Sequence, residues 1–227
     1  MGLSMLPVLS ISLCACLAFG QQSVTFPVPG TESRTAADLY GSGTKYVILA
    51  HGGRFAKESW KKQAQILADS GFAALAIRFR GDSLNPDGSP NAAGSTEENA
   101  QDVSAAVTYL YERGATTVSA IGASLGGDAV GEADANSGPG GMARIVLLAS
   151  SGGSHPEKLT GRKLFIVARD DRNAWGLRLP EIRSHFERAR EPKKLVIIDG
   201  SAHAQFLFET QGGSNVMDQI VRFLTEP

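Results

Sequence analysis

Cysteine is almost missing from this sequence. Its 227 residues include two cysteines, Cys14 and Cys16, and both lie within the first twenty residues. If that segment is removed, the remaining chain has no thiol. Such a chain can form no disulfide, no cysteine-based metal site and no thiol nucleophile. Its stability then has to come from its hydrophobic core, and the chain is long enough to bury a sizeable one.

Charge is missing from the N-terminal segment. Residues 1–20 contain no Asp, Glu, Lys or Arg and include the apolar run Leu9–Phe19. The run is short for a membrane span, and the small residues in Ala18-Phe19-Gly20 suit a signal peptidase. We therefore expect a signal peptide cleaved before Gln21, a single mature domain over 21–227, and a secreted or periplasmic protein.

Other interpretations of this segment stay open. Leu13-Cys14-Ala15-Cys16 loosely resembles a lipoprotein cleavage box, which would leave Cys16 carrying an N-terminal lipid anchor. The segment also lacks the Lys or Arg that normally precedes the apolar run of a signal peptide. A buried N-terminal helix, or a start codon placed upstream of the true one, would instead leave the protein in the cytoplasm.

The chain has neither an excess of one charge nor a cofactor motif. Lys and Arg total 22 and Asp and Glu total 23, so the net charge of −1 gives no reason to expect nucleic acid or an anionic membrane surface as a partner. The four histidines form no cluster with metal-ligand spacing, and Gly52-Gly53 is too short for a phosphate-binding loop. We therefore expect no metal and no cofactor.

Apolar runs of strand length alternate with amphipathic segments of helix length. The strand runs lack a clean apolar–polar alternation, which is typical of parallel strands buried on both faces. Ser95 and Glu98 have the spacing of a capping box that opens a helix through Arg113. We expect one α/β domain with a mostly parallel sheet between two helical layers, its strands at 45–50, 73–79, 117–121, 145–148, 164–168 and 195–198, with one or two edge strands within 24–40.

A serine between two glycines marks the most informative point of the chain. Gly122-Ala123-Ser124-Leu125-Gly126 directly follows the predicted strand at 117–121 and precedes a predicted helix. Gly-x-Ser-x-Gly between a strand and a helix is typical of a nucleophile elbow, a tight and strained turn that leaves no room for bulky neighbours. The same pattern also occurs in structural turns. Whether Ser124 is a nucleophile therefore depends on whether the sequence also supplies a histidine and an acid at matching positions.

Candidate partners stand after other predicted strands. Asp170 and Asp171 follow the strand at 164–168, and His203 follows the strand at 195–198. Ligands of open α/β sheets bind at the carboxyl ends of the strands, where these loops gather. Serine, then acid, then histidine is the chain order of the catalytic triad on an α/β-hydrolase sheet.

These elements resemble the α/β-hydrolase superfamily, in particular its small lidless members of the dienelactone hydrolase and carboxylesterase kind. The resemblance runs from about Tyr40 to the C-terminus. It implies a Ser124 nucleophile, a His203 base and an aspartate that orients the histidine. Superfamily members often carry Gly-x-x-Asp after this strand, and Ala168-Arg169-Asp170-Asp171 matches with Ala in place of Gly. The match favours Asp171, although a one-residue shift of the strand end would favour Asp170.

The resemblance also implies an oxyanion hole built from backbone N–H groups. Leu125, the residue after the serine, is expected to supply one of them. The other comes from the loop after the first long strand, which reads His-Gly-Gly-Gly in lipases and esterases. Here that loop is His51-Gly52-Gly53-Arg54, so either Gly53 or Arg54 is expected to donate.

Four further residues are candidate substrate contacts. Trp175 and Phe206 each closely follow a predicted catalytic loop and would line an acyl pocket, although core packing explains both equally well. His155 follows the strand that ends near Leu148 and would face the cleft. His51 begins the oxyanion loop, where it would contact substrate or order the loop through its own hydrogen bonds.

The expected activity is hydrolysis of carboxylic esters or thioesters, with a small molecule or a polymer end as substrate. The short segment between Leu148 and Lys163 leaves no room for the cap domain that many relatives insert there, so an open site is expected. Acyl transfer to an alcohol or peptide hydrolysis would use the same residues. A non-catalytic binding protein would share the fold, but such proteins usually lose a triad residue.

Overall fold

The computed structural model describes residues 20–92, 94–138 and 141–226. Cys14, Cys16 and the rest of the predicted signal peptide up to residue 19 lie outside these ranges. Within them, no helix is both long and apolar enough to cross a bilayer.

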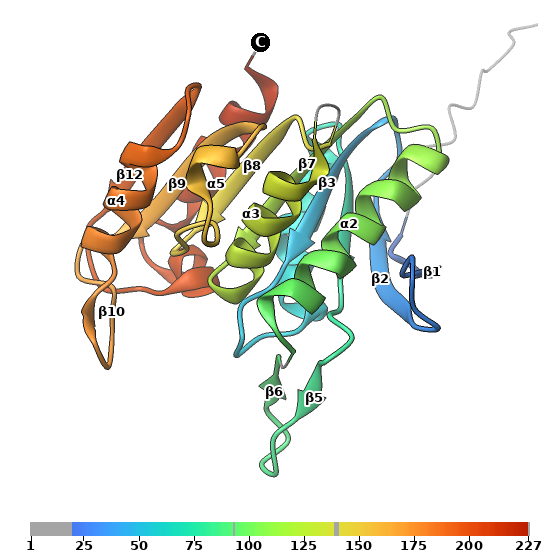
Figure 1. Cartoon of the computed structure of the whole chain (residues 1–227), viewed down its shortest axis with the longest axis horizontal. Coiled ribbons are helices and arrows are strands. Elements are labelled where there is room, and N and C mark those ends of the chain that lie inside the picture. Colours follow the sequence, from blue (N-terminus) through green and yellow to red (C-terminus); the bar gives the residue numbers. More distant parts are fainter. Residues whose placement is uncertain (1–19, 93, 139–140, 227) are drawn as a thin grey trace, which may run out of the picture.

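Eight strands form one twisted, mostly parallel sheet (Figure 1). The first strand pairs antiparallel with the second, the second pairs antiparallel with β4, and all remaining pairs are parallel. The strand order across the sheet is β1 (Gln22–Pro27), β2 (Arg34–Tyr40), β4 (Ala73–Ile77), β3 (Lys45–Ala50), β7 (Thr117–Ala123), β8 (Arg144–Leu148), β9 (Arg162–Ala168) and β12 (Lys193–Ile198).

Helices cover both faces of this sheet. One face carries α2 (Thr96–Glu112), α3 (Leu125–Ser137) and α4 (Leu179–Arg188), which lie in front of the sheet in Figure 1. The other face carries α1 (Lys61–Asp69) and α5 (Gly213–Thr225). The predicted three-layer α/β/α architecture is confirmed. Of the one or two edge strands expected within 24–40, β1 begins earlier, at Gln22, and lies at the edge, whereas β2 pairs with both β1 and β4 and is internal.

The long helix α2 begins as its sequence predicts. The Ser95 hydroxyl accepts a hydrogen bond from the Glu98 backbone N–H at 3.1 Å, and the Glu98 carboxylate accepts one from the Ser95 N–H at 2.8 Å. Two N–H groups that the helix leaves without intrahelical partners are thereby satisfied. This cap fixes where the polar loop after β4 ends.

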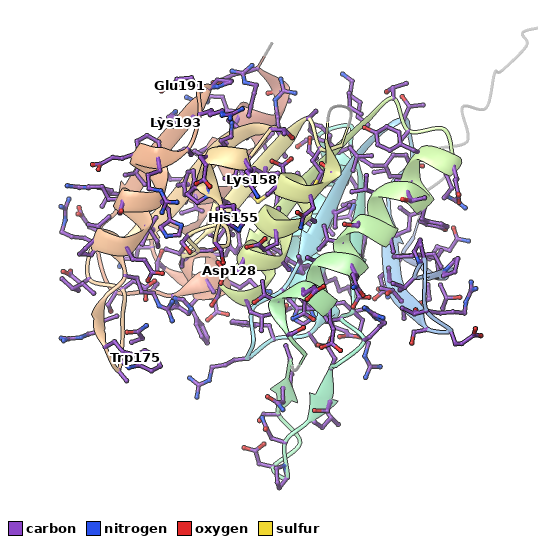
Figure 2. All side chains as sticks on the ribbon, in the orientation of Figure 1. Asp128, His155, Lys158, Trp175, Glu191 and Lys193 are labelled. Carbon is purple, nitrogen blue, oxygen red and sulfur yellow. The ribbon has the colours of Figure 1, made fainter. Side chains whose placement is uncertain are left out.

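Two short hairpins leave the sheet at the carboxyl ends of its parallel strands. The loop after β4 contains β5 (Ser83–Leu84) paired with β6 (Pro90–Asn91). The segment after β9 contains β10 (Arg172–Asn173) paired with β11 (Gly176–Leu177). Figure 1 shows the two hairpins as separate arms at one edge of the molecule, and Figure 2 labels Trp175 at the tip of the second.

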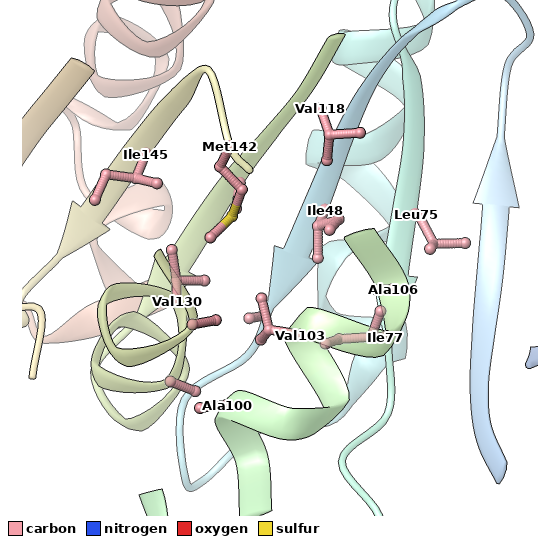
Figure 3. Close-up of a cluster of buried hydrophobic side chains, with 14 of the residues drawn as sticks. Ile48, Leu75, Ile77, Ala100, Val103, Ala106, Val118, Val130, Met142 and Ile145 are labelled. Carbon is pink, nitrogen blue, oxygen red and sulfur yellow. The ribbon is translucent and has the colours of Figure 1, made fainter. Parts of the chain in front are cut away.

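The core lies on both faces of the sheet and is built from aliphatic side chains. On the α2/α3 face, Val103 and Ala106 of α2 and Val130 of α3 pack over Ile48 of β3 (Figure 3). On the other face, α1 and α5 cover the sheet with Leu67, Ile220 and other buried residues. These helical residues recur every three or four positions, so each helix buries one stripe.

Glycines let α3 approach the loop after β8. A Cβ on Gly131 would lie closer than 3.0 Å to the Gly152 carbonyl oxygen, a separation that packed atoms do not tolerate. Both partners of this contact are backbone, so neither a rotamer change nor a side-chain shift relieves it.

We predict that Gly131→Ala lowers the free energy of unfolding by about 2–3 kcal/mol, because overpacking displaces backbone. Denaturant unfolding followed by circular dichroism measures the change. Gly212→Ala is the matched control, since its Cβ meets nothing nearer than 3.8 Å. Equal losses in the two variants would contradict the close approach of α3.

Candidate active site

The turn between β7 and α3 holds Ser124 in a strained conformation. Its φ is +50° and its ψ is −119°, and non-glycine residues rarely adopt positive φ. The Ser124 N–H donates to the Leu148 carbonyl at 2.8 Å, and its own carbonyl accepts from Gly127 and Asp128. These bonds hold the serine at the carboxyl edge of the central strands.

Both glycines of the Gly-x-Ser-x-Gly motif are required by close backbone contacts. A Cβ on Gly122 would collide with the Gly126 carbonyl, and one on Gly126 would collide with the carbonyls of Ala50 and His51. The glycines therefore let α3 start directly above the strand and beside the loop after β3. The elbow geometry that the sequence pattern predicts is present here.

His203 lies between Ser124 and Asp171. Its Nε2 is 2.9 Å from the Ser124 hydroxyl oxygen, and its Nδ1 is 2.8 Å from Asp171 Oδ2. The Asp171 side chain is buried, whereas the imidazole is partly open to solvent. Three loops that follow β7, β9 and β12 thus bring serine, histidine and aspartate into one hydrogen-bonded row.

Of the two adjacent aspartates, Asp171 faces the histidine. Asp170 is exposed, and its N–H donates to the Gly200 carbonyl at 2.9 Å. The hairpin β10–β11 begins at Asp171, because the Arg178 N–H donates to the Asp171 carbonyl at 2.9 Å. The Arg178 Nε also lies 3.8 Å from Asp171 Oδ1, so a cation stands on the side of the carboxylate away from the histidine.

The loop after β3 lies against the start of α3. A Cβ on Gly53 would be 4.0 Å from the Leu125 side chain, and one on Gly52 would be 3.3 Å from the Ala123 carbonyl. Within the described part of the chain, no hydrogen bond occupies the backbone N–H of Gly53, Arg54 or Leu125. The three N–H groups predicted for an oxyanion hole therefore come from neighbouring segments and are unengaged.

Gln205 fixes this loop, and the sequence analysis did not single it out. Its side-chain oxygen accepts the Gly52 N–H at 2.8 Å, and its amide nitrogen donates to the Ser59 hydroxyl. The side chain is buried, on the 3₁₀ turn (Ala204–Glu209) that directly follows His203. A glutamine two residues after a histidine carries no recognisable motif, since its partners lie far away in the sequence.

His51 orders its loop and does not face a substrate. The imidazole is fully buried against Phe79, its Nε2 lies 2.9 Å from Asp82 Oδ2, and its Nδ1 lies 3.1 Å from the Gly52 carbonyl. Both ring nitrogens are occupied by protein atoms, so the prediction of a substrate contact is wrong for this residue. The alternative, a histidine that orders the oxyanion loop, fits its contacts.

The other three candidate contacts differ in their surroundings. Phe206 follows His203 and is half-exposed, its ring centroid 4.9 Å from that of Phe55. Trp175 is solvent-exposed at its hairpin tip, so it packs neither in the core nor in a closed acyl pocket (Figure 2). His155 is half-exposed and has Glu157 as its polar partner at 3.4 Å, without a contact to the three-residue row.

A second, partly buried carboxylate lies one helical turn beyond the serine. Asp128, one helical turn after Ser124, accepts a hydrogen bond from the Ser150 hydroxyl at 2.7 Å. Burial raises the pKa of the Asp128 carboxyl above its ordinary value, and this bond together with the Gly153 N–H only partly opposes the rise. The neighbouring Glu181 raises the pKa further, whereas Arg178 lowers it.

Several hollows of the described surface lie away from the serine. One of about 890 Å³ lies over α2 and α3 and is lined by carboxylates and small residues, with Ser124, His203 and Asp171 absent from its wall. Ser124, Asp171 and His203 lie in loops at the carboxyl ends of the strands. We therefore take their hydrogen-bonded row as the candidate active site. Among the residues that the structure describes, no three His, Asp or Glu side chains gather as ligands for a metal ion.

Known structures with a similar fold are numerous. The dienelactone hydrolase of Anabaena variabilis superposes with a TM-score of 0.69 at 22% identity, covering 90% of this chain and 96% of its own. The monoacylglycerol lipase of Paleococcus ferrophilus gives 0.67 at 17% identity, covering 83% and 97%. The chain has the α/β-hydrolase fold. An esterase of Pyrococcus furiosus gives 0.71 at 14% identity, covering 92% and 90%.

No protein-family model and no curated protein sequence matches the chain. At these identities the α/β-hydrolase likeness describes the arrangement of sheet and helices, while the chemistry has to be argued from the residues themselves. The predicted resemblance to this superfamily, made on the elbow and the order of serine, aspartate and histidine, is confirmed at the level of the fold.

We predict that Asp128→Asn removes part of the pH dependence of stability. A carboxyl whose pKa is raised by folding stabilises the protein fully below its unfolded pKa, and that contribution is lost as pH rises through the folded pKa. The free energy of unfolding of the Asp128→Asn variant should therefore increase relative to that of the wild type as pH rises above about 4. Urea unfolding across this range measures the difference, and a pH-independent difference would contradict it.

Proposed function

We propose that this protein is a serine hydrolase that cleaves carboxylic esters or thioesters through an acyl-enzyme. The observation that carries the proposal is the continuous row from the Ser124 hydroxyl through the His203 imidazole to the Asp171 carboxylate, at 2.9 and 2.8 Å. Nucleophile, base and orienting acid within hydrogen-bond reach of one another are what acyl transfer by serine requires.

In the proposed reaction, His203 Nε2 takes the proton of the Ser124 hydroxyl as its oxygen attacks the carbonyl carbon of the ester. Asp171 accepts a hydrogen bond from Nδ1, so the tautomer is fixed and the imidazolium that forms is stabilised. His203 then gives the proton to the leaving alcohol or thiol. Water repeats the sequence on the acyl-enzyme, releases the acid and restores the serine.

Backbone N–H groups would stabilise the negative charge on the tetrahedral intermediate. Leu125 supplies one donor at the start of α3, and Gly53 or Arg54 supplies the other from the loop after β3. Among the residues that the structure describes, these N–H groups have no other partner, and Gly53 lies near Leu125; both observations support this assignment. The helix start adds a favourable partial positive charge beside the serine.

The proposed substrate is a small ester or the ester end of a larger molecule that approaches from solvent. Residues 149–161, between β8 and β9, contain only one short 3₁₀ turn (Pro156–Lys158), so no cap domain is inserted there. Structural neighbours named as a dienelactone hydrolase, an esterase and a monoacylglycerol lipase support ester substrates. Acyl transfer to an alcohol and peptide hydrolysis share the same residues and stay alternatives, as does a non-catalytic role.

We also propose that the chain is exported, with residues 1–20 acting as a signal peptide. The uncharged, apolar composition of that segment supports export.

We predict that Ser124→Ala and His203→Ala each lower kcat on p-nitrophenyl esters by about 10⁶-fold, because the members of a triad act as a unit. A fluorophosphonate probe should label the folded wild type at Ser124 and leave Ser124→Ala unlabelled. Activity that survives both substitutions, or no labelling of the folded wild type, would refute the proposal. A series of acyl chain lengths, run with competing alcohol acceptors, separates hydrolysis from transfer.

Asp171 and Asp170 provide a matched pair. Asp171→Asn should lower kcat by about 10⁴-fold, the loss that follows removal of the acid in serine proteases. Asp170→Asn should change kcat by less than about threefold, because its carboxylate is exposed and, within the described ranges, has no hydrogen-bond or ion-pair partner. A larger loss in Asp170→Asn would assign the orienting role to Asp170. Equal effects of the two substitutions would remove that role from both residues.

A further inference from the structure

Exposed apolar side chains gather at one edge of the protein. Five large apolar side chains are exposed among the described residues, and four of them lie in loops that follow the carboxyl ends of parallel strands. They are Leu84 (70% exposed), Trp175 (92%), Leu177 (49%) and Phe206 (41%), here called the apolar rim. The fifth, Tyr111 (38%), lies on α2 and donates its hydroxyl to the Gly141 carbonyl.

The rim belongs to the same loops as the proposed catalytic residues. Leu84 is on the β5–β6 hairpin, whose neighbour Asp82 holds His51. Trp175 and Leu177 are on the β10–β11 hairpin, which begins at Asp171. Phe206 follows His203 on its 3₁₀ turn. The rim therefore surrounds the edge at which Ser124 stands.

Two unpaired cations accompany the rim. Arg54 follows Gly53, Arg172 precedes the Trp175 tip, and both side chains are exposed and form no ion pair with any residue that the structure describes. The net charge of the whole chain is −1, and the same two hairpin segments carry the exposed carboxylates Asp87 and Asp170, so any attraction to anions is local to the two guanidinium groups. Guanidinium groups bind phosphates, and tryptophan favours the boundary between water and hydrocarbon.

The arrangement fits an extended surface better than one small molecule. The hairpins project as separate arms, so a flat partner can touch Leu84 and Trp175 together whereas a single small ester cannot (Figure 1). Trp175 at the tip of the β10–β11 hairpin, with Arg172 nearby, and the exposed Leu84 on the β5–β6 hairpin match an acyl layer beneath phosphate head groups.

We propose that the apolar rim docks this protein on the surface of a phospholipid assembly, so that Ser124 meets long-chain esters presented there. The proposal rests on the proposed function for its substrate class, but the docking itself requires no catalysis. Leu84, Trp175 and Leu177 enter the acyl layer, and Arg54 and Arg172 contact the phosphates.

Tryptophan fluorescence provides a direct test of docking. The chain has two tryptophans, of which Trp60 is fully buried and Trp175 is exposed. The Ser124→Ala protein is mixed with vesicles of phosphatidylcholine and phosphatidylglycerol. We expect its emission to shift to shorter wavelength and brominated lipid to quench it, whereas Ser124→Ala/Trp175→Phe, which retains only Trp60, should respond to neither.

Co-sedimentation with the same vesicles measures the strength of docking. Leu84→Ser/Trp175→Ser/Leu177→Ser should reduce the bound fraction by at least about tenfold, since three buried apolar side chains are lost. Tyr111→Ser, the exposed apolar position away from the rim, should bind as the wild type does. Circular dichroism verifies that each variant is folded. Arg54→Gln/Arg172→Gln should weaken binding to the anionic vesicles more than binding to phosphatidylcholine alone.

Two results would overturn the docking proposal. One is an unshifted Trp175 emission with equal sedimentation of the triple variant and Tyr111→Ser. The other is self-association without lipid that the triple variant abolishes, since a second copy of the chain would then cover the rim. Ser124-dependent hydrolysis of soluble esters without vesicle binding removes only the docking proposal. Vesicle binding by a protein whose ester hydrolysis survives Ser124→Ala removes only the proposed function.

Discussion

The close contact between α3 and the two strands beneath it governs the rest of the site. Ser124 can keep its positive φ only if the helix starts immediately above β7, and that start is possible only because Gly122 and Gly126 present no side chain. A strained residue of this kind costs roughly 1–3 kcal/mol, which the surrounding packing has to offset. The hydrogen bond from the Ser124 N–H to Leu148 is part of that support.

Buried aspartates hold the loops around this contact. Asp82 accepts from the Phe79 N–H and faces His51, and Asp102 accepts from the Arg80 N–H and the Thr35 hydroxyl. Asp134 receives the N–H groups of two residues just before β9. Burial raises the pKa of Asp102 and Asp134, as it does that of Asp128. The protein thus carries several desolvated carboxyls whose role is to fix irregular backbone.

Local patterns account for what could be predicted from the sequence. The strand–helix alternation, the Ser95 cap and the elbow each depend on residues a few positions apart, so the fold follows from them. The position of the acid could be narrowed to two neighbours but not chosen from spacing alone. Its choice depends on where β9 ends, and in the structure the strand ends at Ala168.

Contacts between distant segments account for what could not be predicted. Gln205 is 153 residues away from Gly52, and no pattern near either residue signals their hydrogen bond. The burial of His51 depends on Asp82 in another loop. Trp175 looked suited to a pocket or the core, yet a two-residue hairpin turn carries it into solvent. Such exposure is a property of the assembled edge and not of the residue type.

The hydrogen bond between Gln205 and Gly52 joins the loop that carries His203 to the loop proposed to supply oxyanion donors. Neither loop can shift without transmitting the shift to the other through one buried amide. We therefore expect the loops around Ser124 to move together, and the two hairpin arms outside them to be the parts that differ between ligands. A protein organised in this way can exchange its specificity by rebuilding the arms alone.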